Sequence, residues 1–194
     1  MRERLRRALA DPAPEAPLVA VDPQRVAAIA LILLERGGAL DALLIERAER
    51  EGDPWSGHIA LPGGHVEAGD ADLHATAERE TLEEVGLDLR RAGERVGRLS
   101  RYAPVRGVPL AVHPFVYLLE ALPVLTLNAE VRRALWLPLE PLQRGERRTT
   151  YSLLRSGERF ELPAWEVDDR VVWGLTYRVL DDFLARFSAV PGSK

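Results

Sequence analysis

Three glutamates, Glu80, Glu83 and Glu84, lie at positions i, i+3 and i+4 of a segment that contains neither Gly nor Pro. On a helix this spacing places their carboxylates on adjacent turns of one face. Like charges at such spacing destabilise a bare helix, and a divalent cation such as Mg²⁺ or Mn²⁺, bound through several carboxylate oxygens, offsets the repulsion. A solvated acidic face is the ordinary alternative for such a triplet.

The segment before the glutamates favours the metal site over the solvated face. Residues 61–70 have the sequence Leu-Pro-Gly-Gly-His-Val-Glu-Ala-Gly-Asp, so that Gly63 and Gly64 follow a proline and Gly69 comes five residues later. Glycines allow a loop backbone to approach a ligand closely and to offer it carbonyl and amide groups. A glycine-rich loop that leads into an acidic helix indicates a site for a diphosphate and its metal.

Residues 64–87 resemble the Nudix box, whose usual form is G-x5-E-x7-R-E-U-x-E-E-x-G-U, where U is an aliphatic residue. The sequence departs from this form in three places, none of which alters the helix glutamates. Asp70 stands at the first Glu position, eight residues instead of seven separate it from Arg79, and Thr81 fills an aliphatic position. The matching residues are Gly64, Arg79, Glu80, Glu83, Glu84, Gly86 and Leu87.

The resemblance implies a divalent metal held by the helix glutamates and hydrolysis of a nucleoside diphosphate linked to another moiety. It assigns Glu80 and Glu84 as metal ligands, with Glu83 either a third ligand or the base that orients water. Mg²⁺ or Mn²⁺ would neutralise the diphosphate and stabilise charge on its oxygens as a P–O bond breaks. Arg79 is expected to pair with a carboxylate and to fix its rotamer.

The flanking segments are similar to those of the coenzyme A pyrophosphatase branch of the family. Residues 43–48 and 57–64 follow that branch's L-L-T-x-R-[SA] … G-x3-F-P-G-G signature, with aliphatic residues in place of the Thr and the Phe. Residues 171–180 resemble its closing segment. The resemblance implies cleavage of coenzyme A to 4′-phosphopantetheine and adenosine 3′,5′-bisphosphate.

Other functions stay open at this stage. The chain could instead be a broader dinucleotide or nucleotide-sugar pyrophosphatase, an ADP-ribose hydrolase, or a Nudix-like module that senses a nucleotide without cleaving it. The glutamates discriminate between the classes, because a binding-only module has no need of all three of them.

Residues outside the helix are candidates for binding the substrate and for activating water. The backbone of Gly63 and Gly64 would approach the diphosphate. Glu130 lies where Nudix enzymes often carry a late loop glutamate that acts as the base. Arginines offer a bidentate fork to phosphates, although a solvated surface role is the alternative for each, and the candidates are Arg47, Arg101 and Arg106.

The elements that must position these residues interleave strands and helices. Apolar or alternating runs typical of strands lie at residues 26–34, 40–46, 96–99, 108–119 and 133–137. Helical patterns lie at residues 1–10, 70–85 and 174–187. We therefore expect an α/β fold of the Nudix type: an α/β/α sandwich with a mixed, curved sheet, the glutamate helix on one face and the C-terminal helix on the other.

The length of 194 residues predicts a single domain with a sizeable core. We expect an N-terminal helix and Pro-rich connector over residues 1–23, the Nudix domain over residues 24–187, and a flexible tail over residues 188–194. The net charge of −4 argues against a general electrostatic grip on nucleic acid or an anionic membrane.

The absence of cysteine excludes disulfides, zinc fingers and thiol nucleophiles, and makes a reducing compartment the default expectation. No apolar run reaches the roughly 20 residues that a membrane helix needs, and the N-terminus does not resemble a secretory signal. We expect a cytoplasmic, metal-dependent hydrolase whose partner is a small-molecule nucleotide. The sequence leaves a homodimer open.

Overall fold

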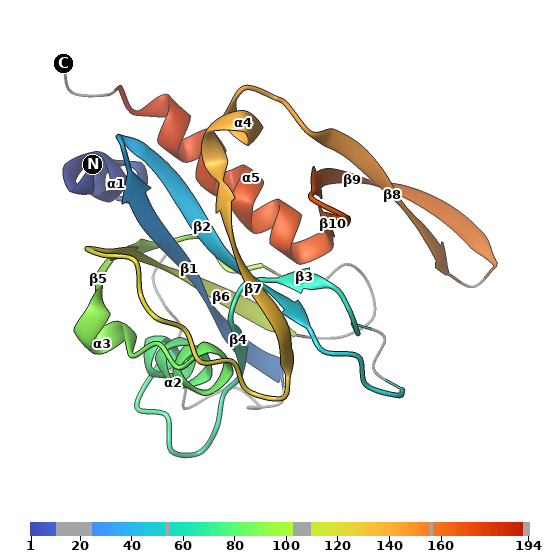
Figure 1. Ribbon diagram of the computed structural model, residues 1–194, viewed down its shortest axis with the longest axis horizontal. Coiled ribbons are helices and arrows are strands. Elements are labelled where there is room, and N and C mark those ends of the chain that lie inside the picture. Colours follow the sequence, from blue (N-terminus) through green and yellow to red (C-terminus); the bar gives the residue numbers. More distant parts are fainter. Residues whose placement is uncertain (11–24, 53–54, 103–109, 156, 192–194) are drawn as a thin grey trace.

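The computed structural model describes residues 1–10, 25–52, 55–102, 110–155 and 157–191. These residues form a seven-stranded sheet, a separate three-stranded sheet and five helices (Figure 1). Among them, no helix combines the length and the apolar character needed to cross a membrane.

The strands and helices have the following bounds. The larger sheet contains β1 (Val26–Arg36), β2 (Ala39–Arg47), β3 (Ile59–Ala60), β4 (Gly63–His65), β5 (Gly93–Arg98), β6 (Ala111–Leu119) and β7 (Val131–Pro138). The smaller sheet contains β8 (Arg148–Arg155), β9 (Glu158–Val167) and β10 (Arg170–Trp173). The helices are α1 (Arg2–Ala8), α2 (Leu73–Val85), α3 (Leu89–Ala92), α4 (Leu139–Gln143) and α5 (Gly174–Ala189).

The larger sheet is mixed, as the sequence predicts. Its central strand β1 pairs in parallel with β6 along one edge, and in antiparallel fashion with β2 and β4 along the other. Strand β7 extends the sheet beyond β2, and β5 extends it beyond β6. Because β4 is paired to β1, the glycine loop is fixed to the centre of the sheet.

Both faces of the larger sheet are covered, which explains why β1 is apolar and buried from Val26 to Leu34. Side chains of a strand alternate between its two faces. Leu31 faces the cluster that contains Phe183 of α5, and Ile32 faces the cluster that contains Ala77 of α2. The expected arrangement is therefore confirmed: the glutamate helix and the C-terminal helix cover opposite faces (Figure 1).

The predicted N-terminal helix is confirmed as α1, and it belongs to the main core. Leu5 is fully buried in the cluster that includes α5. Arg4 donates from Nε to the Val190 carbonyl at 2.9 Å and stacks its guanidinium on the Phe187 ring at 3.8 Å. The connector expected before residue 24 lies outside the described residues, and α5 ends at Ala189, two residues beyond the predicted helix end.

The smaller sheet was not predicted. Its hairpin, β8 and β9, projects from the body of the molecule (Figure 1), so one side of β8 is exposed and the other is at most half-buried. Such a strand lacks the continuous apolar pattern of a core strand and is not recognisable by hydrophobicity alone. Strand β10 returns the chain to β3 and leads directly into α5.

We predict that Leu5→Ala lowers the free energy of unfolding by about 2 to 5 kcal/mol, because it removes a fully buried side chain between α1 and α5. Urea unfolding monitored by circular dichroism measures this. Leu154→Ala is the matched control, since Leu154 is 73% exposed, and it should change the stability by less than about 0.5 kcal/mol. Similar small effects for both variants would contradict the packing of α1.

Candidate active site

The helix that carries the three glutamates begins at Leu73, three residues later than predicted. Asp72 caps it by accepting a hydrogen bond from the Ala75 N–H at 2.9 Å, and Gly86 ends it in a left-handed conformation with φ of +69°. The expected helix is otherwise confirmed. The residues before the cap, Asp70 included, belong to the loop.

The glycine loop lies directly against the glutamates. Gly63 and Gly64 pair with Ile29 and Ala28 of β1, which brings the β4 backbone to α2. The Gly63 N–H donates to Glu84 Oε2 at 3.0 Å. A Cβ added to Gly63, whose φ is +145°, would lie 2.3 Å from the Ala28 carbonyl oxygen, so that only glycine fits there.

Gly64 closely approaches Glu80, a second glutamate of α2. A Cβ at Gly64 would lie 2.3 Å from Oε1 of Glu80 and 2.4 Å from its Cδ. The carboxylate of Glu80 therefore occupies the space that any larger residue at position 64 would need. Two adjacent glycines allow β4 to pack against two carboxylates at once.

Arg79 forms the centre of an ion-pair network, which confirms the expectation that it pairs with a carboxylate. Its Nε and Nη2 donate to the two oxygens of Asp70 at 3.0 and 3.1 Å. Its Nη1 donates to Glu80 at 3.0 Å and to Glu83 at 3.2 Å, and its Nη2 also donates to the His65 carbonyl at 2.9 Å. One guanidinium thus fixes two glutamates relative to the loop.

Asp70 stands at the position of the first Glu of the box, and its shorter side chain still binds Arg79 through both carboxylate oxygens. Its carboxylate is 4% exposed and also accepts hydrogen bonds from Thr76 Oγ1 at 2.8 Å and from the Glu67 N–H at 2.9 Å. Burial acts to raise the pKa of Asp70, but the hydrogen bonds from Arg79, Glu67 and Thr76 lower it below its usual value. Asp70 is therefore the ionised anchor of Arg79.

Glu84 is the most deeply buried of the helix glutamates, at 3% exposure. Burial raises its pKa to about 8, and the nearby charges of Glu80 and Glu130 add to the rise. The Gly63 N–H and the positive charge of Arg47 act in the opposite direction. A buried carboxylate with so little compensating positive charge is a typical feature of a functional site.

The glutamates do not form a finished metal cage. Among the described residues, no three acidic or histidine side chains converge closely enough to hold an ion. Arg79 holds Glu80 and Glu83, and Gly63 holds Glu84, so each carboxylate is directed at a donor of the protein. Burial also raises the pKa of Glu80, against the opposing effect of Arg79.

The donor set nevertheless fits a hard divalent cation. Carboxylate oxygens are the ligands that Mg²⁺ and Mn²⁺ prefer, and a cation would relieve the cost of burying the Glu80 and Glu84 charges together. The side chain of Glu83 is 53% exposed, so a cation in solvent has access to it. The assignment of these three residues as ligands stays a prediction.

Glu130 is brought to the site by backbone hydrogen bonds. The loop before it is fastened to the end of α2, because the Asn128 N–H donates to the Glu84 carbonyl at 3.0 Å. The Glu130 carboxylate accepts a hydrogen bond from Arg50 Nη2 at 2.7 Å and is 44% exposed. Sequence reasoning did not single out Arg50; its position shortly after the strand that carries Arg47 is the only signal that could have found it.

The candidate arginines are not all brought together. Arg47 lies near enough to Glu84 to influence its pKa. Arg101 is exposed, and its neighbours Ser100 and Tyr102 are hydrogen-bonded to α5, on the face opposite α2. No hydrogen bond or ion pair joins Arg101 to the glutamates in the described part of the chain, and Arg106 lies outside it.

The departure at Thr81 is absorbed within the helix. Thr81 is fully buried, and its Oγ1 donates to the Ala77 carbonyl at 2.7 Å. A threonine can satisfy its hydroxyl in this way inside a helix. The aliphatic position of the box therefore keeps its packing role with a polar residue in it.

Comparisons with known proteins agree with this geometry. A family model described as NUDIX domain matches residues 23–155. The mitochondrial coenzyme A diphosphatase NUDT8 of Homo sapiens is 31% identical over 170 residues, which are 86% of this chain and 70% of that protein. An uncharacterized protein of Schizosaccharomyces pombe is 44% identical over 106 residues, 52% of this chain and 32% of that protein.

A solved structure of another protein has a similar fold. The crystal structure of a MutT/nudix family protein from Enterococcus faecalis matches with a TM-score of 0.56 at 22% identity, covering 90% of this chain and 66% of that chain. The chain spans about half the length or less of several curated relatives that it matches, among them two plant proteins called Nudix hydrolases, from Arabidopsis thaliana.

We predict that Asp70→Ala lowers the free energy of unfolding by about 2 to 4 kcal/mol, because it leaves Arg79 and two further donors without their buried acceptor. Chemical denaturation measures the change. The control is Glu67→Gln, which alters an exposed carboxylate 3.7 Å from the same arginine and should cost less than about 0.5 kcal/mol. Equal effects would show that Asp70 does not anchor Arg79.

Proposed function

We propose that this chain, which belongs to the Nudix family, hydrolyses the diphosphate bond of a nucleoside-diphosphate derivative and that its preferred substrate is coenzyme A. The observation that carries the hydrolase proposal is the close packing of the Glu80 and Glu84 carboxylates against Gly63 and Gly64. The products from coenzyme A would be 4′-phosphopantetheine and adenosine 3′,5′-bisphosphate.

Two features support coenzyme A in particular. The segments at residues 43–48 and 57–64 resemble the signature of coenzyme A pyrophosphatases. The human relative, which matches 86% of this chain, is a coenzyme A diphosphatase by name.

Glu80 and Glu84 would hold Mg²⁺ or Mn²⁺ at this site, and Glu83 would be either a third ligand or the base. When bound, the metal neutralises the diphosphate and polarises the phosphorus that water attacks. Arg79 acts as a positioning residue, because it fixes Glu80 and is itself fixed by Asp70. The β4 backbone lies beside the same carboxylates and offers the diphosphate a surface without side chains.

Two residues compete for the role of base. Glu83 and Glu130 have side chains that are 53% and 44% exposed, so both can contact a water molecule. Glu83 is held by Arg79, and Glu130 is held by Arg50. A general base needs a carboxylate within hydrogen-bond reach of the attacking water, and both side chains are accessible to solvent.

We predict that Glu80→Gln and Glu84→Gln each lower kcat roughly 100-fold or more, because each removes a charged oxygen from the metal site while glutamine keeps the size of the side chain. The assay is release of adenosine 3′,5′-bisphosphate from coenzyme A with Mg²⁺ or Mn²⁺, followed by liquid chromatography. Thermal unfolding of each variant confirms that the fold is retained.

Glu78→Gln is the matched control on the same helix. Glu78 accepts a hydrogen bond from the Tyr117 hydroxyl, which glutamine can also accept, and it lies outside the proposed metal site. The control should retain activity. Full activity in Glu80→Gln or Glu84→Gln would refute the hydrolase proposal.

A substrate panel tests the specificity. Coenzyme A, ADP-ribose, NADH and a diadenosine polyphosphate are incubated in parallel, and we expect the highest kcat/KM for coenzyme A. A higher value for another member of the panel would replace coenzyme A and leave the hydrolase proposal intact. Tight binding with every substrate left uncleaved would indicate a nucleotide sensor.

A second pair of variants identifies the base. The two variants are Glu130→Gln and Glu83→Gln. The one that lacks the base should have a kcat roughly 100-fold to 10,000-fold lower, with a much smaller change in KM. The other variant should lose less, because it retains the proton acceptor. Wild-type kcat in both variants would exclude both residues from this role.

A further inference from the structure

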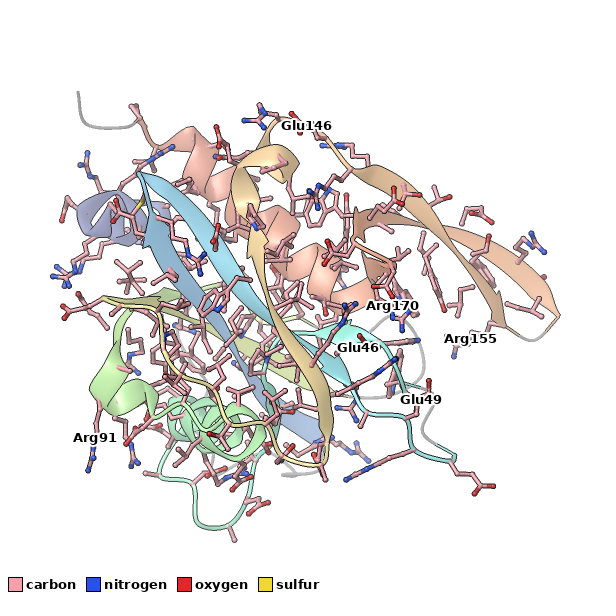
Figure 2. The ribbon with its side chains drawn as sticks, in the orientation of Figure 1. Glu46, Glu49, Arg91, Glu146, Arg155 and Arg170 are labelled. Carbon is pink, nitrogen blue, oxygen red and sulfur yellow. The ribbon has the colours of Figure 1, made fainter. Side chains whose placement is uncertain are left out.

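A second charged cluster lies at the end of β2, where the fully buried Glu46 meets three arginines. Arg132 Nη1 donates to Glu46 Oε1 at 2.8 Å, and Arg170 Nη2 donates to the same oxygen at 3.1 Å. Arg133 donates from Nε to Glu46 Oε2. Figure 2 shows Arg170 reaching from β10 toward Glu46 on β2, so the cluster joins the two sheets.

A β-bulge creates this convergence. Glu46 pairs with Arg133 across the β2–β7 ladder, but the next residue of β2, Arg47, pairs with Val131. Arg132 is therefore the extra residue of β7 at the bulge. Adjacent residues of a regular strand point to opposite faces, whereas a bulge redirects side chains, and here both Arg132 and Arg133 reach one carboxylate.

The cluster holds more positive charge than a buried glutamate needs. A single arginine fork can satisfy both oxygens of a carboxylate. Here three guanidinium groups face two carboxylates, those of Glu46 and Asp169. Burial acts to raise the pKa of Glu46, but Arg133 and Arg170 lower it below its usual value, so both carboxylates are ionised and one positive charge is left over.

The surplus donors face solvent. The side chains of Arg132, Arg133 and Arg170 are 53%, 38% and 33% exposed, although the carboxylate that orients them is 1% exposed. Each guanidinium carries five N–H donors, and only some of them reach a carboxylate. The buried Glu46 thus orients three arginines whose side chains remain accessible to solvent.

The cluster lies at the same end of the β2–β7 pair as the candidate active site. Arg132 follows Glu130 by two residues, and Glu46 precedes Arg47; Glu130 and Arg47 both act on the pKa of Glu84. Glu46 and Arg47 point to opposite faces of the sheet. In the described part of the chain, β7 pairs only with β2, so β7 is an edge strand of the larger sheet beside both groups of residues.

We propose that Arg132, Arg133 and Arg170 bind a phosphomonoester that the substrate carries in addition to its diphosphate. This inference rests on the proposed function, whose diphosphate would lie at the glutamates. A dianionic phosphate matches the surplus positive charge and the fork geometry of arginine. In coenzyme A this group is the 3′-phosphate of the adenosine, which ADP-ribose and NADH lack.

The experiment compares coenzyme A with 3′-dephospho-coenzyme A, which differ in that phosphate alone. We expect the wild-type protein to have a kcat/KM roughly 10-fold to 100-fold higher for coenzyme A, as charge-assisted hydrogen bonds of this kind provide. In Arg132→Gln the ratio of the two kcat/KM values should fall at least roughly fivefold, because the most exposed arginine is lost while Arg133 and Arg170 still neutralise Glu46. Arg132→Lys, which keeps the charge, should restore part of the ratio.

Arg36→Gln is the matched control. Arg36 is 48% exposed and pairs at 3.2 Å with Asp41, an 11% exposed carboxylate at the other end of β2. Its removal has a comparable structural effect and should leave the ratio unchanged. Equal kcat/KM values for both substrates in the wild-type protein, or an unchanged ratio in Arg132→Gln, would overturn the proposal.

A binding measurement separates this proposal from the proposed function. Calorimetry compares adenosine 3′,5′-bisphosphate with adenosine 5′-monophosphate on the wild-type protein and on Arg132→Gln. A protein that cleaves neither coenzyme A nor 3′-dephospho-coenzyme A would refute coenzyme A as the substrate, but tighter bisphosphate binding that depends on Arg132 would still support the phosphate site. Equal affinity for both nucleotides would overturn it. Inorganic phosphate that binds as tightly as the bisphosphate would overturn the substrate-borne assignment as well.

Discussion

The close approach of the β4 backbone to helix α2 determines the chemistry of this molecule. Gly64 has no side chain in the space that the Glu80 carboxylate occupies, and the Gly63 N–H donates to Glu84, so both carboxylates lie against the β4 backbone and are largely removed from water. Burial next to like charge is unfavourable for an ionised carboxylate and raises its pKa. Two carboxylates are therefore buried together with little positive charge to compensate them, and we propose that a divalent cation and its diphosphate supply that compensation.

The rest of the architecture keeps this approach in place. Strand β1 is apolar on both faces, so α2 and α5 can pack on opposite sides of it and hold β4 at its edge. Asp70 and Arg79 fix the loop to the helix: the carboxylate accepts two hydrogen bonds from the arginine, and the arginine extends to Glu80. The box usually has a glutamate at this position, one residue closer to the arginine. Asp70 can still bind Arg79 because it lies in the loop before α2 and not within the helix.

The sequence predicted what depends on local pattern. Helical spacing identified α2 and its glutamates, and apolar runs identified β1 and β2, because periodicity and glycine positions are visible within a short window. It did not predict contacts between distant segments. Glu46 and Arg170 are 124 residues apart and meet only because β10 returns to the larger sheet. Arg101 stays a prediction: its residue type suits a phosphate, but its neighbours Tyr102 and Ser100 are hydrogen-bonded to α5.

The central proposal is that the buried carboxylates of Glu80 and Glu84 together bind a divalent cation. The most direct measurement is a titration of the protein with Mn²⁺ in the absence of nucleotide, followed by the electron paramagnetic resonance signal of free Mn²⁺. The account predicts saturable binding to the wild-type protein and a loss of at least roughly tenfold in affinity when Glu80 and Glu84 are both changed to glutamine. Equal binding by the two proteins would contradict it.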